Sequence, residues 1–344
     1  MVIVMISVLV LSILAGGFAY SMKVETKLAR NANSENELEW LGRSGVEYAR
    51  WILAQQLTIQ NEPYDALNQV WAGGPGGIGT TNSPLVDVQR EVHLGSGSFT
   101  WKITDMESKY NINIANEQVL QQALVLMGAS ASDTTPIVNC ILDWITPSKN
   151  ARVEGAKDDF YQTQDPPYYA KNGPIDDLSE LLLVKNITPD IYWGPTSTNH
   201  PEGAFQQRFM QNTAPGAPQV YPVGLVDLFT PMSDGKLNVN TASAAALQLI
   251  PGVDSTVAEA IVAGRSGEDD GSGLLGPYKT VTEVSRVPEV PRPLIGQLGQ
   301  FCDVRSKTFQ VEVDAQVGGY HRQFIAVLGR NSPRDVQVLC FYWK

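Results

Sequence analysis

The chain opens with an uninterrupted apolar run. No side chain from Met1 to Met22 carries a charge, and residues 2–15 are apolar except for two serines. About 20 residues of α-helix span the roughly 30 Å hydrocarbon core of a bilayer. The pattern predicts one membrane-embedded helix, because the rest of the sequence has no second run of this kind.

The apolar pattern continues with helical spacing after this run. Residues 23–57 contain no Pro, and apolar or small residues recur there at mostly three- and four-residue steps, at Val24, Leu28, Leu38, Leu41, Gly45, Tyr48, Ala49, Ile52, Leu53 and Leu57. The sequence therefore predicts one helix of about 50 residues, apolar at its start and amphipathic later. Two alternatives stay open: a cleaved secretory signal, although residues 15–19 match a cleavage site only loosely, and an ordinary anchor with a coiled stalk.

The basic residues near the apolar run give a conflicting indication of topology. Lys23, Lys27 and Arg30 follow the run, and no basic residue precedes it. The positive-inside rule would then place the body in the cytoplasm. We give the rule little weight here, because the chain begins inside its apolar segment and a short basic leader would change the balance.

Alternating apolar and polar residues predict strands on both sides of the middle of the chain. Residues 86–92 and 98–104 alternate around a turn at 93–97, which is typical of a hairpin. Three further strands are predicted at 308–317, 322–330 and 336–343. Each has one apolar face, as in an antiparallel sheet that covers a helix on one side.

A helical insertion at about residues 110–300 separates the two groups of strands, and it repeats internally. Tyr110-Asn-Ile-Asn-Ile-Ala115 corresponds to Leu237-Asn-Val-Asn-Thr-Ala242. Two apolar helices follow each motif, at 117–127 and 133–145 and at 243–250 and 254–264, and farther on 178–187 resembles 281–290. In the second copy a helix–hairpin–helix turn is predicted at Pro251, Gly252 and Asp254, where Gly supplies the backbone freedom.

These patterns predict an α+β fold, with a long N-terminal helix packed on an antiparallel sheet and a large inserted α-helical domain. The expected division is a membrane and stalk helix at 1–57, the first part of the β domain at 58–109, the insertion at 110–300 with copies at about 110–195 and 236–300, and the final strands at 301–344.

Charge and motif content restrict the function. The net charge of −11 and the isoelectric point near 4.8 disfavour phosphate binding, and Asp254 lies inside the hairpin itself, so no nucleic-acid partner is expected. His93, His200 and His321 lie far apart, and neither Gly-x-Ser-x-Gly nor His-Glu-x-x-His occurs, so no enzyme is expected.

Three cysteines are too few for a disulfide framework. Cys140 lies in an apolar run and is predicted to be a buried thiol. Cys302 and Cys340 flank the C-terminal strands, and the sequence leaves open whether they pair.

Calcium is the one cofactor that the sequence leaves open. Ca²⁺ takes six to eight oxygen ligands and tolerates irregular loops. Glu154, Asp158, Asp159 and Asp165 supply four carboxylates within twelve residues, and residues 267–270 form a second acidic loop. Neither segment fits the EF-hand pattern.

Nearly end to end, the chain resembles the K-class minor pseudopilins of the bacterial type II secretion system. The resemblance rests on the motif Leu237–Ala242 and on an ordered series of short motifs: Asp143-Trp-Ile145, Glu154-Gly-Ala156, Asp159-Phe-Tyr161, Pro166-Pro-Tyr168, Ala170-Lys-Asn172 and Leu178-Ser-Glu-Leu181. It implies a pilin-like protein with no catalysis, anchored in the inner membrane by one span and with its body in the periplasm. Such a subunit would lie at the tip of a short pseudopilus and help to start its assembly.

The resemblance also implies partners and a mode of assembly. The partners would be the I- and J-class minor pseudopilins and the major pseudopilin, contacted laterally through Val2, Ile6, Leu9, Ile13 and Leu14. Pilins carry a Glu five residues into the mature helix, and K-class members typically lack it; here position 5 is Met and no acid precedes Glu25. A type IV pilus minor pilin and a membrane-anchored helix–hairpin–helix DNA-uptake protein stay as alternatives.

The sequence departs from the family at two points. The family often has further acids after Asp143-Trp-Ile145, in the loop associated with calcium, whereas this chain reads Thr146-Pro-Ser-Lys149. The family's basic leader is not among these residues, so processing by a prepilin peptidase is not argued.

Overall fold

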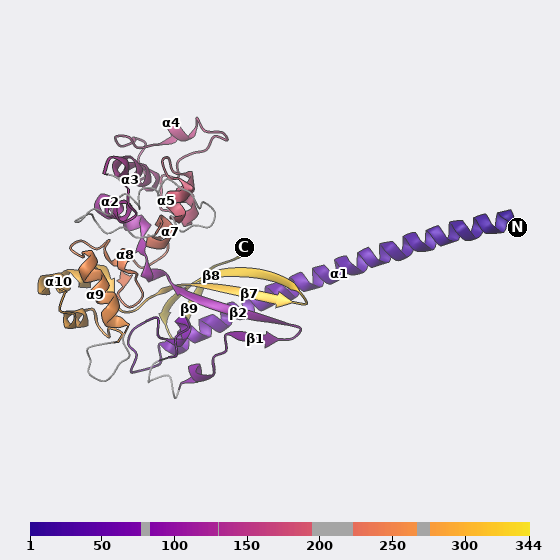
Figure 1. Ribbon diagram of the computed structural model, residues 1–344, viewed down its shortest axis with the longest axis horizontal. Coiled ribbons are helices and arrows are strands. Elements are labelled where there is room, and N and C mark those ends of the chain that lie inside the picture. The colour runs from indigo at the N-terminus through magenta and orange to yellow at the C-terminus, as the bar shows by residue number, and fades with distance from the viewer. Residues whose placement is uncertain (77–82, 130, 195–222, 267–275) are drawn as a thin grey trace.

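A single long helix connects the N-terminus to the body of the protein. The computed structural model describes residues 1–76, 83–129, 131–194, 223–266 and 276–344. In it, α1 (Val2–Gln56) is one continuous helix, and Figure 1 shows its first half standing away from every other element. The predicted long helix is confirmed.

The second half of α1 packs on the sheet. Leu38, Leu41, Ala49 and Ile52 are buried where the helix contacts β2, β7 and β8. Their three- and four-residue spacing places them on one helical face. The buried face begins later than the sequence pattern suggests, because Val24 and Leu28, although on the same pattern, are exposed.

The sheet has five strands in the order β1-β2-β7-β8-β9, and all neighbours are antiparallel. The strands are β1 (Glu91–Leu94), β2 (Gly97–Asp105), β7 (Thr308–Val317), β8 (Tyr320–Ser332) and β9 (Asp335–Trp343). Alternate residues of β7, including Phe309, Val311 and Val313, are buried on the face that covers α1. The antiparallel sheet on one long helix is thus as predicted (Figure 1).

The first predicted strand, at 86–92, is wrong over most of its length. Pro84–Asp87 forms a 3₁₀ turn, and the Ser83 hydroxyl accepts a hydrogen bond from the Leu85 N–H at its start. Leu85 is only 1% exposed. The turn buries this leucine, and the alternating apolar and polar residues after it do not form a strand until Glu91.

The insertion joins the end of β2 to the start of β7, two strands paired through Asp105↔Phe309. Figure 1 shows two lobes, one with α2 to α7 and one with α8 to α10. Two short parallel pairs support them: β3 (Tyr110–Asn111) with β4 (Phe229–Thr230), and β5 (Leu237–Asn238) with β6 (Cys302–Asp303). The helices are α2 (Glu117–Leu126), α3 (Ala131–Ile145), α4 (Asp158–Tyr161), α5 (Pro189–Trp193), α7 (Leu225–Leu228), α8 (Ala244–Leu247), α9 (Ser255–Arg265) and α10 (Arg292–Phe301).

Helix α8 is shorter than the predicted helix at 243–250. Its end tightens, because the N–H groups of Leu249 and Ile250 donate to carbonyls three residues back rather than four. The chain thereby turns early into the hairpin.

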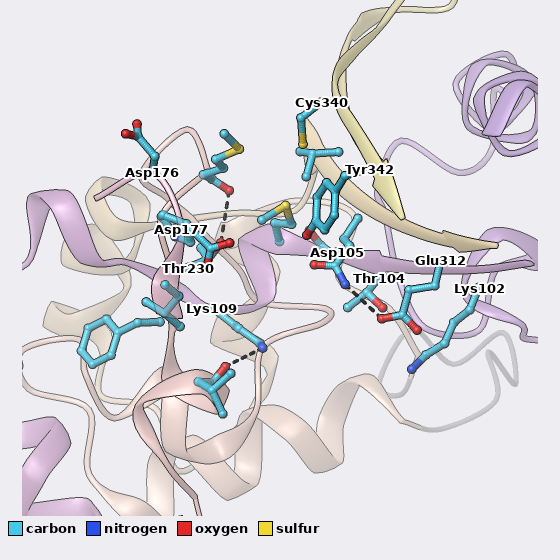
Figure 2. A pocket seen from close by; sticks show the side chains of 18 of the residues that line it. Lys102, Thr104, Asp105, Lys109, Asp176, Asp177, Thr230, Glu312, Cys340 and Tyr342 are labelled. Carbon is cyan, nitrogen blue, oxygen red and sulfur yellow. Dashed lines mark hydrogen bonds between the residues drawn. The ribbon is translucent and has the colours of Figure 1, made fainter. Parts of the chain in front are cut away.

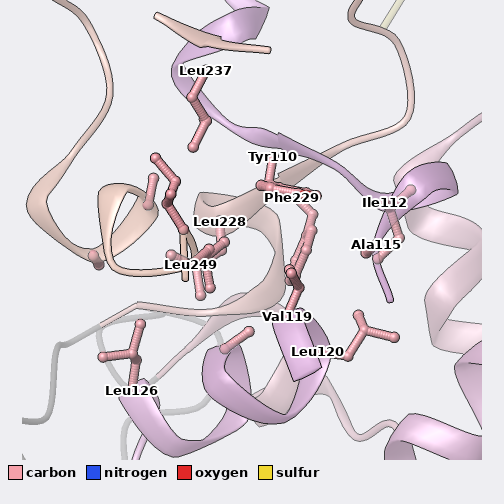
Figure 3. Close-up of a cluster of buried hydrophobic side chains, with 14 of the residues drawn as sticks. Tyr110, Ile112, Ala115, Val119, Leu120, Leu126, Leu228, Phe229, Leu237 and Leu249 are labelled. Carbon is pink, nitrogen blue, oxygen red and sulfur yellow. The ribbon is translucent and has the colours of Figure 1, made fainter. Parts of the chain in front are cut away.

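Two separate apolar cores support the division into a β domain and an insertion. One core lies between α1 and the sheet. The other fills the insertion and joins its two lobes, with Tyr110 and Phe229 beside Leu237 and Leu249 (Figure 3). The boundaries given from the sequence stay a prediction.

A substitution at Gly45 tests how closely α1 approaches the sheet. A methyl group at this position would overlap Val313, whereas one at Gly16 would meet no atom within 4 Å. We expect Gly45→Ala to lower the free energy of unfolding of the full chain in detergent by about 1–2 kcal/mol, since overpacking outweighs the gain in helix propensity. Gly16→Ala, the control, should leave the midpoint of urea unfolding unchanged; equal midpoints for the two variants would contradict the close packing.

Candidate functional site

The residues predicted to mediate assembly all lie on the free half of α1, which we define as the exposed residues 2–29. Val2, Ile6, Leu9, Ile13 and Leu14 are between 56% and 70% exposed. Among the described residues, α1 is the one helix long and apolar enough to cross a membrane, and none of its most apolar stretch is buried. Removing such a surface from water is favourable, so this half of the helix is suited to a bilayer or to contact with other apolar helices.

The three predicted hairpin residues come together in the turn between α8 and α9. Gly252 has φ +85°, the left-handed conformation that favours glycine. Asp254 is the N-cap of α9, and its Oδ1 accepts the Val257 N–H at 2.9 Å. This carboxylate places a negative charge at the N-terminus of α9, and the expectation of no nucleic-acid partner stays a prediction.

The repeated Asn-x-Asn motifs perform the same task in both lobes. The amide of Asn113 accepts from the Ile175 N–H and donates to the Ile175 carbonyl, at 2.7 and 2.9 Å. Asn240 makes the same pair of bonds with Tyr278, at 2.8 and 2.9 Å. Each pair of bonds connects the residues just after a short strand, β3 or β5, to the segment before a 3₁₀ turn. This turn is Leu178–Leu183 in the first copy and Val281–Arg286 in the second.

The four candidate calcium ligands do not converge. Glu154, Asp159 and Asp165 are exposed, and the Oδ1 of Asp158 accepts the Ala170 N–H at 2.9 Å. Within the described ranges, no group of three or more His, Cys, Asp or Glu side chains is placed to hold a metal ion. In this arrangement the four residues do not fit a calcium ion; the second acidic loop, 267–270, lies outside the described residues.

A buried polar network joins the insertion to the β domain, and the sequence patterns did not indicate it. The guanidinium of Arg330, 3% exposed, donates to the carboxylate of Asp65 and to the carbonyls of Leu53 and Ser306. The Asn238 amide of the second Asn-x-Asn motif donates to the Asp65 carbonyl at 3.0 Å. Helix α1, strand β8 and the insertion therefore meet at one buried ion pair.

Two carboxyl groups share this network. The Oδ2 of Asp105 accepts from Asn238, Thr241 and Ser306, and a side-chain hydrogen bond links Asp105 to Glu107. Burial raises the pKa of Asp105, and burial together with the Asp105 charge raises the pKa of Glu107 from its ordinary 4.5 to about 8. Burial thus favours the protonated form of Glu107 at neutral pH.

A pocket of about 530 Å³ marks the seam between the sheet and the insertion (Figure 2). Lys102, Glu312 and Tyr342 line the wall formed by the sheet, where Lys102 and Glu312 face each other across β2 and β7, and the insertion supplies the opposite wall with Asp177 and Thr230. The Lys109 amine donates to the Val226 carbonyl at 2.7 Å, and burial lowers the pKa of this lysine. The lining mixes both signs of charge with apolar surface, as in a joint between two domains.

All three cysteines are free, so the pairing of Cys302 with Cys340 does not form. Cys140 is buried, as predicted, and Cys302 is buried in β6. Burial raises the pKa of Cys140 to about 11 and that of Cys302 to about 12. Thiols with such pKa values are unreactive at neutral pH.

Glu107 makes stability depend on pH. Because its pKa rises from 4.5 to about 8 on folding, the folded chain keeps a proton that the unfolded chain loses. The free energy of unfolding should fall between pH 5 and pH 8, by up to about 1.4 kcal/mol per pH unit. Glu107→Gln, measured by urea unfolding of the full chain, should flatten most of this slope, and the exposed control Glu289→Gln should keep it. An unchanged slope in Glu107→Gln would place the proton elsewhere.

Comparisons with known proteins agree with the sequence resemblance. Residues 103–194 match the family of type II secretion system (T2SS) protein K, and residues 233–302 match the helix-hairpin-helix motif. The putative type II secretion system protein K of Escherichia coli (strain K12) is 24% identical over 209 residues, 56% of this chain and 58% of that protein. The type II secretion system protein K of Klebsiella pneumoniae is 24% identical over 116 residues, 30% of this chain and 36% of that protein. The matched region thus spans less than two thirds of the length of these relatives.

A solved structure shares the fold. A chain of the crystal structure of the GspK-GspI-GspJ complex from the type 2 secretion system of enterotoxigenic Escherichia coli aligns with a TM-score of 0.64. The alignment covers 92% of this chain and 99% of that chain, at 17% identity. The predicted α+β, pilin-like fold is confirmed, and residues 103–194 of the chain are similar to the family of type II secretion system protein K.

Proposed function

We propose that the protein is a structural minor pseudopilin at the tip of the type II secretion pseudopilus, where it helps to initiate assembly for protein export across the outer membrane. The observation that carries the proposal is the division of α1 into a half covered by its own sheet and an uncovered apolar half. Such a helix is stable in lipid or against apolar helices of other subunits. In the proposed role it uses both, first as an anchor and then as an assembly contact.

The proposed location is the inner membrane, with one span and the body in the periplasm. One described helix has the length and composition of a span, and Lys23 and Lys27 follow its apolar part. The positive-inside rule alone favours the opposite orientation. The periplasmic body is inferred from the resemblance to secretion protein K.

The proposed partners are the I- and J-class minor pseudopilins and the major pseudopilin. The structurally similar chain of enterotoxigenic Escherichia coli was solved in the GspK-GspI-GspJ complex. In this protein, β1 and β9 are the outer strands of the sheet, and β9 exposes Leu339, Tyr342 and Trp343. An open edge with exposed apolar side chains is suited to contact with another subunit.

The shape of the molecule supports the proposed tip position. Figure 1 shows the insertion at the end opposite the free half of α1. A domain of this size there would block a further subunit from stacking on that end. The absence of an acid before Glu25 fits a subunit with no neighbour above it, and we propose a role without catalysis.

A charge in the free half of α1 tests the anchor and assembly role. Leu9→Arg should block membrane insertion or assembly and abolish secretion, because a mid-bilayer Arg costs about 2.5–3.5 kcal/mol on insertion scales. Leu67→Arg is the control, since Leu67 is exposed on the body. Normal secretion by the Leu9→Arg strain would contradict the proposal.

Capture of partners tests the tip assignment. The full chain, co-expressed with the I- and J-class pseudopilins of the same genome and extracted in detergent, should be purified as a ternary complex. The absence of a complex with a folded chain would contradict the assignment. In parallel, the acidic chain should not shift duplex DNA on a low-salt gel, and a shift would favour the DNA-uptake alternative.

A further inference from the structure

A buried ammonium group lies inside the loop that the sequence associates with calcium. Lys157 is 5% exposed, and its Nζ donates to the carbonyl of Asp143, to the carbonyl of Thr146 at 2.8 Å and to the Asn172 Oδ1 at 2.6 Å. All three N–H donors of the ammonium are used. The oxygens that surround this positive charge belong to the main chain and to an amide.

The three bonds connect three segments that are separate along the chain. Asp143 and Thr146 lie at the end of α3, Lys157 directly precedes α4, and Asn172 lies in the segment after it. Asn172 itself takes a left-handed backbone conformation, with φ +52°, and its amide donates to the Ala170 carbonyl at 3.1 Å. The ammonium of Lys157 thus links the end of α3 to Asn172.

Two of the nearby carboxylates, Asp143 and Asp158, are already bound by protein groups. Both oxygens of Asp143, whose side chain is 1% exposed, accept from Arg152, one from its N–H and one from its guanidinium, each at 2.9 Å. A Cβ at position 155 would overlap this carboxylate, so glycine is required there. Asp158 is bound by the Ala170 N–H. A calcium ion would have to break these bonds to use Asp143 or the Oδ1 of Asp158 as a ligand.

We propose that the ammonium of Lys157 occupies the cation position of this loop, so that the insertion is held together by one of its own side chains and not by a bound calcium ion. Carbonyl and amide oxygens around one positive charge are the kind of ligand set that Ca²⁺ uses. A fixed positive charge among these oxygens repels a second cation. The inference is independent of the role at the pseudopilus tip.

The first test uses the unmodified full chain in detergent. Its thermal midpoint should be the same in EDTA and in millimolar CaCl₂, and isothermal titration with CaCl₂ should give no heat of binding. A midpoint that falls in EDTA, or saturable calcium binding, would overturn the proposal even if every variant failed to fold.

Variants of Lys157 test the oxygen cage directly. Lys157→Met keeps the apolar stem and removes the charge, and it should lower the thermal midpoint by about 5–10 °C with or without calcium. The matched control is Lys149→Met, an exposed lysine of the same loop, which should leave the midpoint unchanged. Equal midpoints for the two methionine variants would show that the ammonium does not hold the loop.

Charge reversal tests whether the site prefers a cation. Lys157→Glu adds a carboxylate beside the same carbonyl and amide oxygens, so the variant should be unstable in EDTA and should regain several degrees in millimolar CaCl₂. MgCl₂ should be less effective, because Mg²⁺ demands a stricter octahedral geometry. A Lys157→Glu chain that folds and is as indifferent to calcium as the unmodified chain would show that these oxygens form no cation position.

Discussion

The buried ion pair between Arg330 and Asp65 is the contact on which the arrangement of the domains depends. The guanidinium also binds the carbonyl of Leu53 in α1 and that of Ser306 before β7, and it lies 4.5 Å from the centre of the Phe309 ring. A buried ion pair adds little net stability compared with an apolar substitute, but losing one partner costs about 3–5 kcal/mol. Its role here is therefore geometric: it allows one relative position of helix, sheet and insertion.

Hydrogen-bonded side chains extend this constraint into the insertion. Asn238 connects Asp65 to Asp105, and the next asparagine of the same motif, Asn240, bridges to Tyr278. The first copy repeats the bridge with Asn113. Because amides satisfy both a donor and an acceptor of the main chain, each lobe is fixed without a regular sheet of its own. The free half of α1 and the insertion are therefore held in a defined relation at opposite ends of the molecule.

Periodicity predicted the elements that bury a repeating apolar face. Strand β7 begins and ends where the alternation does, and α1 follows its apolar spacing from Leu38 onward. The polar junction was not predictable in this way, since its ion pair joins residues 265 positions apart. One of them, Asp65, lies in a stretch without periodicity. The bond to Asp158 was not predictable from spacing either: carboxylates close in sequence indicated a metal site, whereas the Oδ1 of Asp158 accepts the N–H of Ala170.

The placement of the insertion has a consequence for how the chain folds. The pairing of β2 with β7 closes a loop that contains the entire insertion. If the insertion were still unfolded, closing so long a flexible loop would be slow. The insertion has its own apolar core, and its first and last short strands end close to the sheet. Once the insertion has folded, its two ends lie close together, and β2 and β7 are brought near each other. We therefore expect pulse-labelling hydrogen exchange to show protection in the insertion before protection in β2 and β7, and the reverse order would exclude this route.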